Sequence, residues 1–162
     1  MPAIAKPSEA DVRLAGEGEA GEIASVLYDA FVEYEPLYTP EAFAATAVKA
    51  DRILSRWSEG PVWVALLNGE VVGTVAAVPR DRALYVRSMG IAPKGRGRGL
   101  GLLLLERAEE HARRNGFERL TLSTTEFLYH AIGLYRRFGF KHSNVQIPDL
   151  FGTPLFAMFK DL

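Results

Sequence analysis

The sequence predicts an α/β or α+β fold in which hairpins and helices build a sheet of mixed strand direction. Two apolar, β-branched runs flank Asn68-Gly69, a glycine-rich stretch directly precedes a leucine-rich helical segment, and apolar residues recur at helical spacing before the first hairpin. The chain has 162 residues, of which 48% are hydrophobic and 24% are charged. These values are typical of a globular protein, and we expect a single domain over residues 1–162 with a substantial core.

The first elements are a short strand at "DVRLA" and two helices. In "GEIASVLYDAFVEY" the apolar residues follow helical spacing, as Ile23 and Leu27 illustrate. After "EPLYTPE" breaks this pattern, we expect Thr39 to cap a second helix that has Pro40 at its first position. Apolar residues then recur every three or four positions as far as Trp57, which predicts one continuous amphipathic helix to that point.

The later elements alternate strands with helices. Asn68-Gly69 favours a type I′ turn, because both central residues of that turn need positive φ. The strands on either side of the turn are apolar on both faces, which predicts a sheet covered on each side. Further strands are expected at "ALYVRSMGIAP", "RLTLSTT" and "PLFAMFK". Helices are expected at "LGLLLLERAEEHARRNGF", whose leucine run 102–105 should pack in the core, and at "HAIGLYRRF".

Composition excludes several classes of function. The formal net charge of −1 gives no reason to expect nucleic acid or an anionic membrane as partner. The chain has no cysteine, which excludes disulfides, thiolate catalysis and zinc–thiolate sites. The N-terminal stretch has no apolar signal core and no segment reaches the length of a membrane span, so we expect a cytoplasmic protein. His111, His130 and His142 lack the spacing of metal ligands, and no metal is expected.

The stretch "KGRGRGLG", from Lys94 to Gly101, lies between an expected strand and an expected helix. Such a junction presents free N–H groups at the positive end of the helix dipole, and glycines let a phosphate approach the backbone. The motif G-x-G-x-x-G fails on spacing, and the P-loop fails because the chain has no Gly-Lys-Ser/Thr. A third pattern, R/Q-x-x-G-x-G/A, fits from Arg96 to Gly101. A flexible loop or an RGG-like RNA contact is the alternative, which the net charge and the adjoining helix disfavour.

This third pattern resembles the acyl-CoA-binding signature of the GNAT superfamily of N-acetyltransferases. "MGIAPKGRGRGLGLLLLE" looks like the family's strand, pyrophosphate loop and helix, and "AIGLYRRFGF" looks like its A-x-x-L-Y-x-x-x-G-F segment. The similarity covers most of the chain and is strongest over residues 62–142. It implies a single GNAT-type acyltransferase domain with a mixed, mostly antiparallel sheet of six to seven strands, flanked by roughly four helices.

The resemblance implies that acetyl-CoA is the acyl donor and that a primary amine receives the acetyl group. Its pyrophosphate would lie on the backbone of Arg96, Gly97, Arg98, Gly99, Leu100 and Gly101. The pantetheine arm would pair, like an added strand, with Met89, Gly90 and Ile91. A backbone N–H near Met89 would stabilise the tetrahedral oxyanion.

Tyr135 matches the family's tyrosine and would protonate the departing thiolate. A tyrosine of pKa near 10 stays protonated at neutral pH, whereas the parent pKa of a thiol is about 8.5. Its helical spacing also fits a plain core tyrosine. No motif fixes the general base: Glu126 is the first candidate, and Glu33 and Glu35 are the others.

The acceptor amine is left open by the sequence. A small molecule, an antibiotic, a peptide N-terminus and a lysine side chain all fit, and residues 31–43 are expected to set acceptor specificity. The chain has Leu128 where the family often has an asparagine, so one contact to the cofactor is expected to be missing. A homodimer is among the assemblies that the resemblance allows. A non-catalytic acyl-CoA-binding or sensor domain of the same fold is the alternative function.

Overall fold

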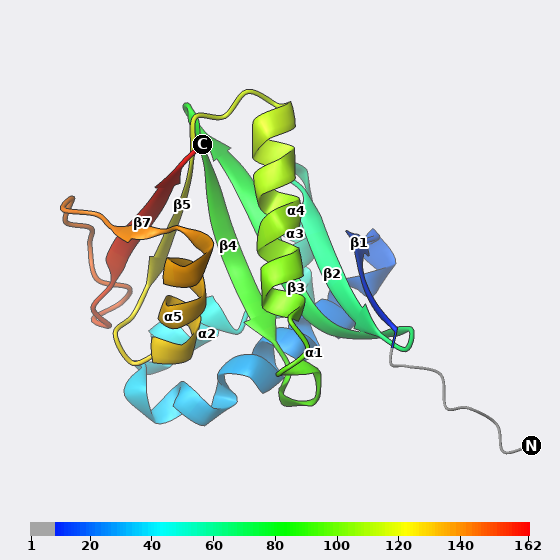
Figure 1. The fold of residues 1–162 in the computed structure, drawn as a ribbon. Helices are drawn as coiled ribbons and strands as arrows, with labels where there is room; N and C mark the ends of the chain where they lie inside the picture. The colour runs from blue at the N-terminus through cyan, green and yellow to red at the C-terminus, as the bar shows by residue number, and fades with distance from the viewer. Residues whose placement is uncertain (1–8) are drawn as a thin grey trace, which may run out of the picture.

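A seven-stranded sheet forms the centre of the molecule, in the order β1-β2-β3-β4-β5-β7-β6 (Figure 1). The computed structural model describes residues 9–162; residues 1–8, which begin the N-terminal stretch without a signal core, lie outside the described part. Only β4 and β5 run parallel, and the other neighbouring strands are antiparallel. The expected mixed, mostly antiparallel sheet is therefore confirmed, at the upper end of the expected strand number.

The strands are β1 (Ala10–Leu14), β2 (Val62–Leu67), β3 (Glu70–Arg80), β4 (Ala83–Ile91), β5 (Arg119–Thr124), β6 (Lys141–His142) and β7 (Phe156–Asp161). The α-helices are α1 (Ala20–Phe31), α2 (Pro40–Thr46), α3 (Ala50–Ser55), α4 (Leu100–Arg114) and α5 (Tyr129–Phe138). Short 3-10 turns are η1 (Glu17–Glu19), η2 (Val32–Leu37), η3 (Trp57–Glu59) and η4 (Pro93–Gly95). Within residues 9–162, every helix is too short or too polar to cross a bilayer.

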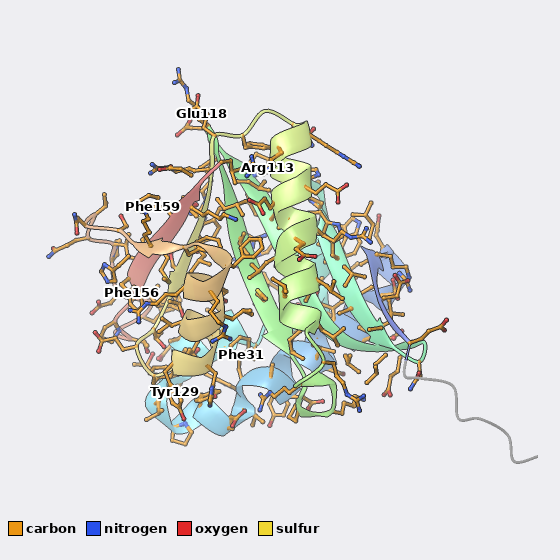
Figure 2. The ribbon with its side chains drawn as sticks, viewed as in Figure 1. Phe31, Arg113, Glu118, Tyr129, Phe156 and Phe159 are labelled. Atoms are coloured by element: carbon orange, nitrogen blue, oxygen red, sulfur yellow. The ribbon has the colours of Figure 1, made fainter. Side chains whose placement is uncertain are left out.

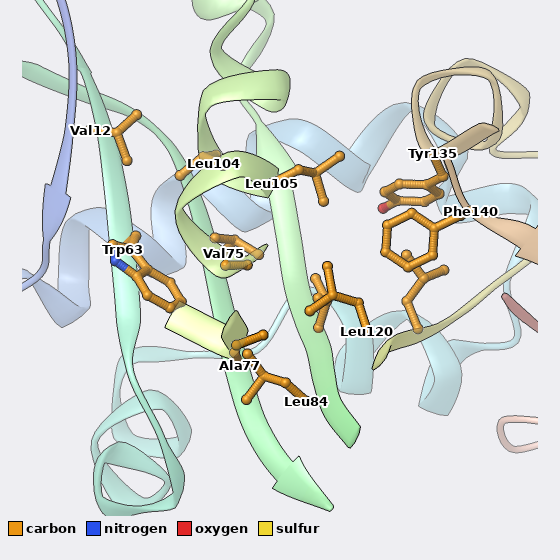
Figure 3. Close-up of a cluster of buried hydrophobic side chains, with 14 of the residues drawn as sticks. Val12, Trp63, Val75, Ala77, Leu84, Leu104, Leu105, Leu120, Tyr135 and Phe140 are labelled. Carbon is orange, nitrogen blue, oxygen red and sulfur yellow. The ribbon is translucent and has the colours of Figure 1, made fainter. Parts of the chain in front are cut away.

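Two apolar cores cover the two faces of the sheet, as the both-sided apolar strands predicted. α4 and α5 lie in front of the sheet in Figure 1, and their buried side chains pack on strand residues such as Val75 and Leu120. Figure 3 shows this larger core, with Leu104 and Leu105 of α4 above the strands. The second core joins α1, α3 and Val64 of β2 on the opposite face.

The helix expected from Thr39 to Trp57 is two helices, so that prediction is wrong. Its start is confirmed, because the Thr39 hydroxyl accepts a hydrogen bond of 3.2 Å from the N–H of Ala42. α2 then ends at Thr46 and α3 begins at Ala50. The break places Val48 in the second core, where it is buried beside residues of α1 and α3. Val48 is thus a core residue that the helical spacing of this segment does not indicate.

The turn signal at Asn68-Gly69 is confirmed, and the helix signal at the leucine run is confirmed in part. Asn68 and Gly69 have φ of 52° and 81°, as a type I′ turn requires. In α4, Leu104 and Leu105 are fully buried, but Leu102 is 41% exposed. The leucine run therefore does not pack in the core as a whole, because a helix turns successive residues to different faces.

Candidate active site

The two parallel strands β4 and β5 separate at one end of the sheet. They pair only from Ala83 to Tyr85 on β4 and from Arg119 to Thr121 on β5. Both strands continue beyond this point, β4 to Ile91 and β5 to Thr124. The gap therefore exposes unpaired strand edges of the kind to which an extended ligand can add.

A β-bulge in β4 accompanies this separation. Thr74 of β3 pairs with Gly90 and Ala76 pairs with Arg87, so one β3 residue lies opposite two residues of β4. Those two are Ser88, whose φ is 51°, and Met89. A bulge bends its strand and releases backbone groups from the ladder. It thus turns β4 away from β5 at the level where the gap opens.

A cavity of about 780 Å³ occupies the gap, a size suited to a small substrate. Its walls come from β4 and β5, from α5, from the segment between η2 and η3, and from the chain before β7. Phe31, Tyr38 and Glu41 line it, and so do residues 44–49. Part of the segment 31–43 therefore reaches the cavity, but the lining continues well beyond Phe43, as far as Arg56.

The glycine-rich loop lies at the start of α4. Gly97 and Gly99 have φ of 74° and 73°, and Gly99 is the N-cap of α4. A Cβ built on either glycine would have no neighbour within 4 Å, so conformation rather than crowding requires glycine here. Leu103 is the first helical N–H to bond, to the Gly99 carbonyl at 3.2 Å. The N–H groups of the preceding turn have no intrahelical acceptor, an arrangement that suits the binding of an anion.

Gly95 and Gly101 serve packing instead. A Cβ on Gly101 would lie 2.7 Å from Cδ2 of Leu134, and one on Gly95 would lie 2.8 Å from Cγ2 of Val72. These glycines let the loop and the first turn of α4 sit close against α5 and β3. Figure 2 shows Phe31 and Tyr129 at the end of the molecule where α4 begins, and Arg113 at the end where it finishes.

The cationic residues of the loop are tied to neighbouring segments. Arg96 forms an ion pair of 2.6 Å with Glu33 and donates a hydrogen bond of 3.2 Å to the Ala30 carbonyl. Lys94 pairs with Glu70. The side chains of all four paired residues are substantially exposed, where such pairs are weak and exchange readily. The Arg96–Glu33 pair links the loop directly to η2.

Of the three residues expected along the pantetheine arm, only Met89 lines the cavity. Met89 lines the cavity, whereas Gly90 and Ile91 pair with Thr74 and Gly73 of β3. A Cβ on Gly90 would lie 3.0 Å from Cβ of Ala30, so close packing of α1 explains this glycine. The contribution of Gly90 and Ile91 to cofactor binding stays a prediction.

Tyr135 lines the cavity from α5 and also belongs to the larger core (Figure 3). It is only 8% exposed, and its ring meets that of Phe140 edge to face at 5.8 Å. Burial, with Tyr38 and Tyr85 nearby, raises the pKa of Tyr135 well above its ordinary value. Within residues 9–162, the hydroxyl of Tyr135 has no hydrogen-bonding partner.

None of the three carboxylates expected as bases lines the cavity. Glu126 is exposed in the turn between β5 and α5 and does not line it. Glu33 is paired with Arg96, and Glu35 is exposed. The acidic side chains that do line the cavity are Glu41 and Asp51. Sequence reasoning did not single out either as a base, because helical spacing does not show which side chains of this segment face the gap.

Two further polar groups at the cavity are fully buried and lack partners in the described part of the chain: Nε of Arg87 and Oγ1 of Thr125. Leu128 also lines the cavity, at the N-cap of α5, without a side-chain cap. Alternation along β4 could have marked Arg87, since Leu84 and Val86 point to the α4 face and Tyr85 and Arg87 to the other. This alternation places Arg87 on the face of β4 opposite α4. Only the gap between β4 and β5 shows that Arg87 also borders a cavity.

Comparison with known proteins agrees with this geometry. Residues 24–140 match the family described as "Acetyltransferase (GNAT) family". The N-acetyltransferase YjgM of Escherichia coli, described as uncharacterized, is 33% identical over 126 residues, covering 74% of this chain and 75% of that protein. N-acetylaspartate synthetase of Danio rerio is 34% identical over 103 residues, covering 60% of this chain and 36% of that protein. A crystal structure of a Thermoplasma acidophilum N-acetyltransferase in complex with coenzyme A superimposes with a TM-score of 0.78 at 16% identity, covering 95% and 99% of the two chains.

Proposed function

Because the chain belongs to the acetyltransferase (GNAT) family and is an N-acetyltransferase that uses acetyl-CoA, we propose that it acetylates a primary amine by direct attack on the thioester. The reaction takes place in the cavity between β4 and β5. The observation that carries this proposal is the combination of that cavity with a glycine loop at the start of α4. One feature accommodates an extended acyl arm and the other an anionic pyrophosphate.

The cofactor lies across the α4 end of the gap in this proposal. The backbone of residues 96–101 holds the pyrophosphate, and the free edge of β4 holds the pantetheine arm up to the bulge. Backbone groups of Ser88 and Met89, which the bulge leaves out of the β3–β4 ladder, are available to the thioester. An N–H donor at that position would stabilise the oxyanion that forms when the amine attacks.

The proton balance of the transfer assigns two roles. The neutral amine nitrogen attacks the thioester carbonyl, a C–N bond forms, the C–S bond breaks, and the thiolate leaves. The nitrogen loses one proton to a base, and the sulfur gains one from an acid. Tyr135 is the acid in this proposal, because its raised pKa keeps it protonated and its hydroxyl has no competing partner within residues 9–162.

For the base we propose Glu41, acting directly or through a water, beside the earlier candidate Glu126. Glu41 lines the cavity in the first turn of α2, close in sequence to Tyr38. Tyr38 in turn is near enough to Tyr135 to affect its pKa. Asp51 also lines the cavity, and it directly precedes Arg52, which lines the cavity too.

The names of the relatives do not select an acceptor for this chain. The Danio rerio protein is named for an acetylated aspartate, and YjgM is named without a substrate. A panel of amines with acetyl-CoA, followed by the release of free thiol, tests the function. We expect turnover with at least one class of primary amine and none with matched tertiary amines. Thiol release that proceeds at the same rate without any amine would contradict transfer to an amine.

A further inference from the structure

The wall of the cavity opposite α4 and α5 is strongly cationic. The cavity is lined by five basic residues and two acidic ones, Glu41 and Asp51. The basic ones are Lys49, Arg52, Arg56, Arg80 and Arg87. The whole chain has a formal net charge of −1, so this excess is local. A concave surface with an excess of one sign of charge concentrates ligands of the opposite sign.

Arg87 is only partly neutralised. Its Nη1 forms an ion pair of 2.9 Å with Glu59, and its side chain is 20% exposed. Its Nε is buried and has no hydrogen-bond partner within the described residues. A buried N–H of a charged group is costly to leave unpaired, so this donor is suited to an acceptor that the free protein does not supply.

Arg56 lies beside Arg87 and shares its surroundings. Both line the main cavity, and both line a smaller adjoining pocket of about 30 Å³ under α1 and α3. Burial, with Arg87 and Arg52 close by, lowers the pKa of Arg56. In residues 9–162 Arg56 makes no ion pair. Two neighbouring guanidinium groups of which only Arg87 is paired with a carboxylate repel each other, and a bound anion would relieve this repulsion.

These arginines are separate from the cofactor's phosphates. The phosphate loop lies at the start of α4, on the same face as the larger core. Arg56 and Arg87 line a pocket with Ile23, Leu27 and Val48 of the second core, on the opposite face of the sheet. An anion bound there therefore approaches the gap from the side of α1 to α3, which is the side left for the acceptor.

We propose that the acceptor is a free amino acid, whose carboxylate is bound by Arg56 and Arg87 while its amine faces the thioester. A planar guanidinium binds a carboxylate through paired hydrogen bonds, which orients as well as holds it. The same wall repels polyamines and basic peptides. This inference rests on the proposed amine acetylation, whose substrate class it names.

The test compares each amino acid with its own α-carboxamide, which keeps the amine and removes the charge. Spermidine serves as a cationic amine without a carboxylate. For the best amino acid, kcat/KM should exceed that of its amide at least tenfold, and spermidine should be poorer still. Arg56→Gln should raise KM for the acid by about 10- to 100-fold, the range expected when one charged hydrogen-bonding group is lost. It should leave KM for the amide and for acetyl-CoA nearly unchanged.

The matched control is Arg114→Gln, which removes the same charge from an exposed i,i+4 pair on α4. It should leave every constant near wild type. Arg87→Gln should behave like Arg56→Gln, and folding of each variant is followed by its melting temperature. Equal or better turnover of amides, of spermidine or of a peptide N-terminus would overturn the inference while leaving the acetyltransferase function intact.

A binding measurement covers the case in which turnover fails. N-acetyl amino acids, which are the products, are titrated calorimetrically into the protein with coenzyme A present. Binding of the acids but not of their amides, weakened by Arg56→Gln, would support the arginine site even if no amine were acetylated. Absence of such binding by any N-acetyl amino acid would overturn the inference independently of catalysis.

Discussion

Tyr135 contributes to the packing of the core and, in the proposed reaction, to catalysis. The ring of Tyr135 packs beside Phe140 in the larger core (Figure 3). Tyr135 also lines the cavity in the β4–β5 gap. Burial raises its pKa, so the hydroxyl stays neutral at every pH at which a primary amine is acetylated. Packing holds the hydroxyl in place and its raised pKa keeps it protonated, while the same rise makes it a weaker acid than a free tyrosine.

Tyr135→Phe separates these purposes. We expect kcat to fall by about 10²- to 10⁴-fold, the usual contribution of general acid catalysis. The affinity for acetyl-CoA and the melting temperature should change little, because the ring remains and the hydroxyl has no hydrogen bond within residues 9–162. Phe140→Leu is the packing control, which should lower the melting temperature without a selective loss of kcat. If the Tyr135→Phe enzyme kept full kcat, Tyr135 would have only a structural role in the core.

The two candidate bases can be compared directly. Glu41 lines the cavity and Glu126 does not, although both carboxylates are exposed enough to be replaced without unfolding the protein. Glu41→Gln should lower kcat/KM for the amine by about 10²-fold, whereas Glu126→Gln should leave it near wild type. The measurement is the pH dependence of kcat/KM for each variant. If only Glu126→Gln is impaired, Glu126 is the base and the proton leaves by way of the β5–α5 turn.

At the scale of elements, the junction between β4 and α4 uses its glycines for two physical reasons. Gly97 and Gly99 adopt left-handed conformations in open space, and Gly95 and Gly101 avoid side chains of β3 and α5. The first pair shapes the loop toward a ligand, and the second pair lets the loop pack. Substitution of Gly97 or Gly99 should therefore mainly affect ligand binding, whereas substitution of Gly95 or Gly101 should mainly affect packing.

Gly99→Val tests the role of the loop in cofactor binding. A β-branched residue disfavours the φ of 73°, and its side chain would occupy space that the pyrophosphate needs. Gly116→Val is a matched control at the other end of α4, with φ of 77° and the same empty surroundings. We expect similar losses of melting temperature, but a decrease of at least tenfold in coenzyme A affinity for Gly99→Val only. If calorimetry gave the same coenzyme A affinity for both variants, the phosphate would not bind at this loop.

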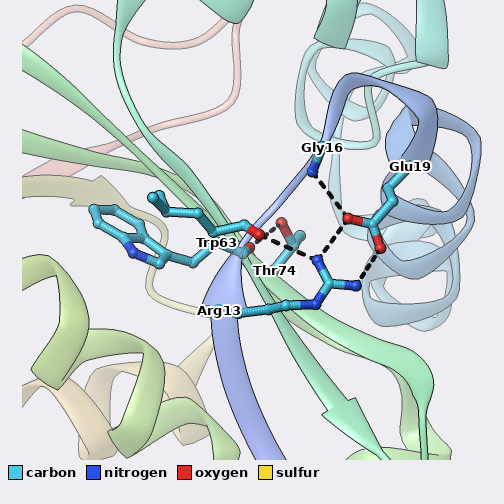
Figure 4. A network of polar contacts seen from close by, with 6 residues as sticks. Arg13, Gly16, Glu19, Trp63 and Thr74 are labelled. Carbon is cyan, nitrogen blue, oxygen red and sulfur yellow. Dashed lines mark hydrogen bonds and ion pairs between the residues drawn. The ribbon is translucent and has the colours of Figure 1, made fainter.

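At the scale of the whole molecule, a polar network fastens the first strand to the turn before α1 (Figure 4). Arg13 donates two hydrogen bonds of 2.8 Å to Glu19, and the N–H of Gly16 donates one of 2.9 Å. These bonds lower the pKa of Glu19 to about 2. The neighbouring bond from Thr74 to the Trp63 carbonyl joins the two strands beneath them.

This network should make folding stability depend on acid. The lowered pKa means that Glu19 contributes stability above its ordinary value of 4.5, and that this contribution is lost as the pH falls toward about 2. Arg13→Gln should lower the melting temperature at pH 7 and flatten its decline between these two values. Arg114→Gln should keep a pH profile parallel to that of wild type. A parallel profile for Arg13→Gln as well would assign the acid sensitivity to other carboxylates.

The sequence alone determined the local chemistry of this protein. The Asn68-Gly69 turn, the Thr39 cap and the loop from Arg96 to Gly101 each follow from backbone preferences of residues adjacent in the chain. The motif that includes Tyr135 has the same local character, and it led to the family that comparison then showed. Such features can be predicted from the sequence because neighbouring residues alone determine them.

The tertiary structure decided what faces the gap. No local signal marks the break between α2 and α3, and Val48 within it is buried against other elements. Glu41 lines the cavity and Glu126 does not, and neither placement follows from the residues adjacent to them in the chain. Arg56 and Arg87 are 31 positions apart and meet only across η3 and β4. Contacts between distant segments depend on how whole layers pack, and for that reason the acceptor side could be read only from the folded chain.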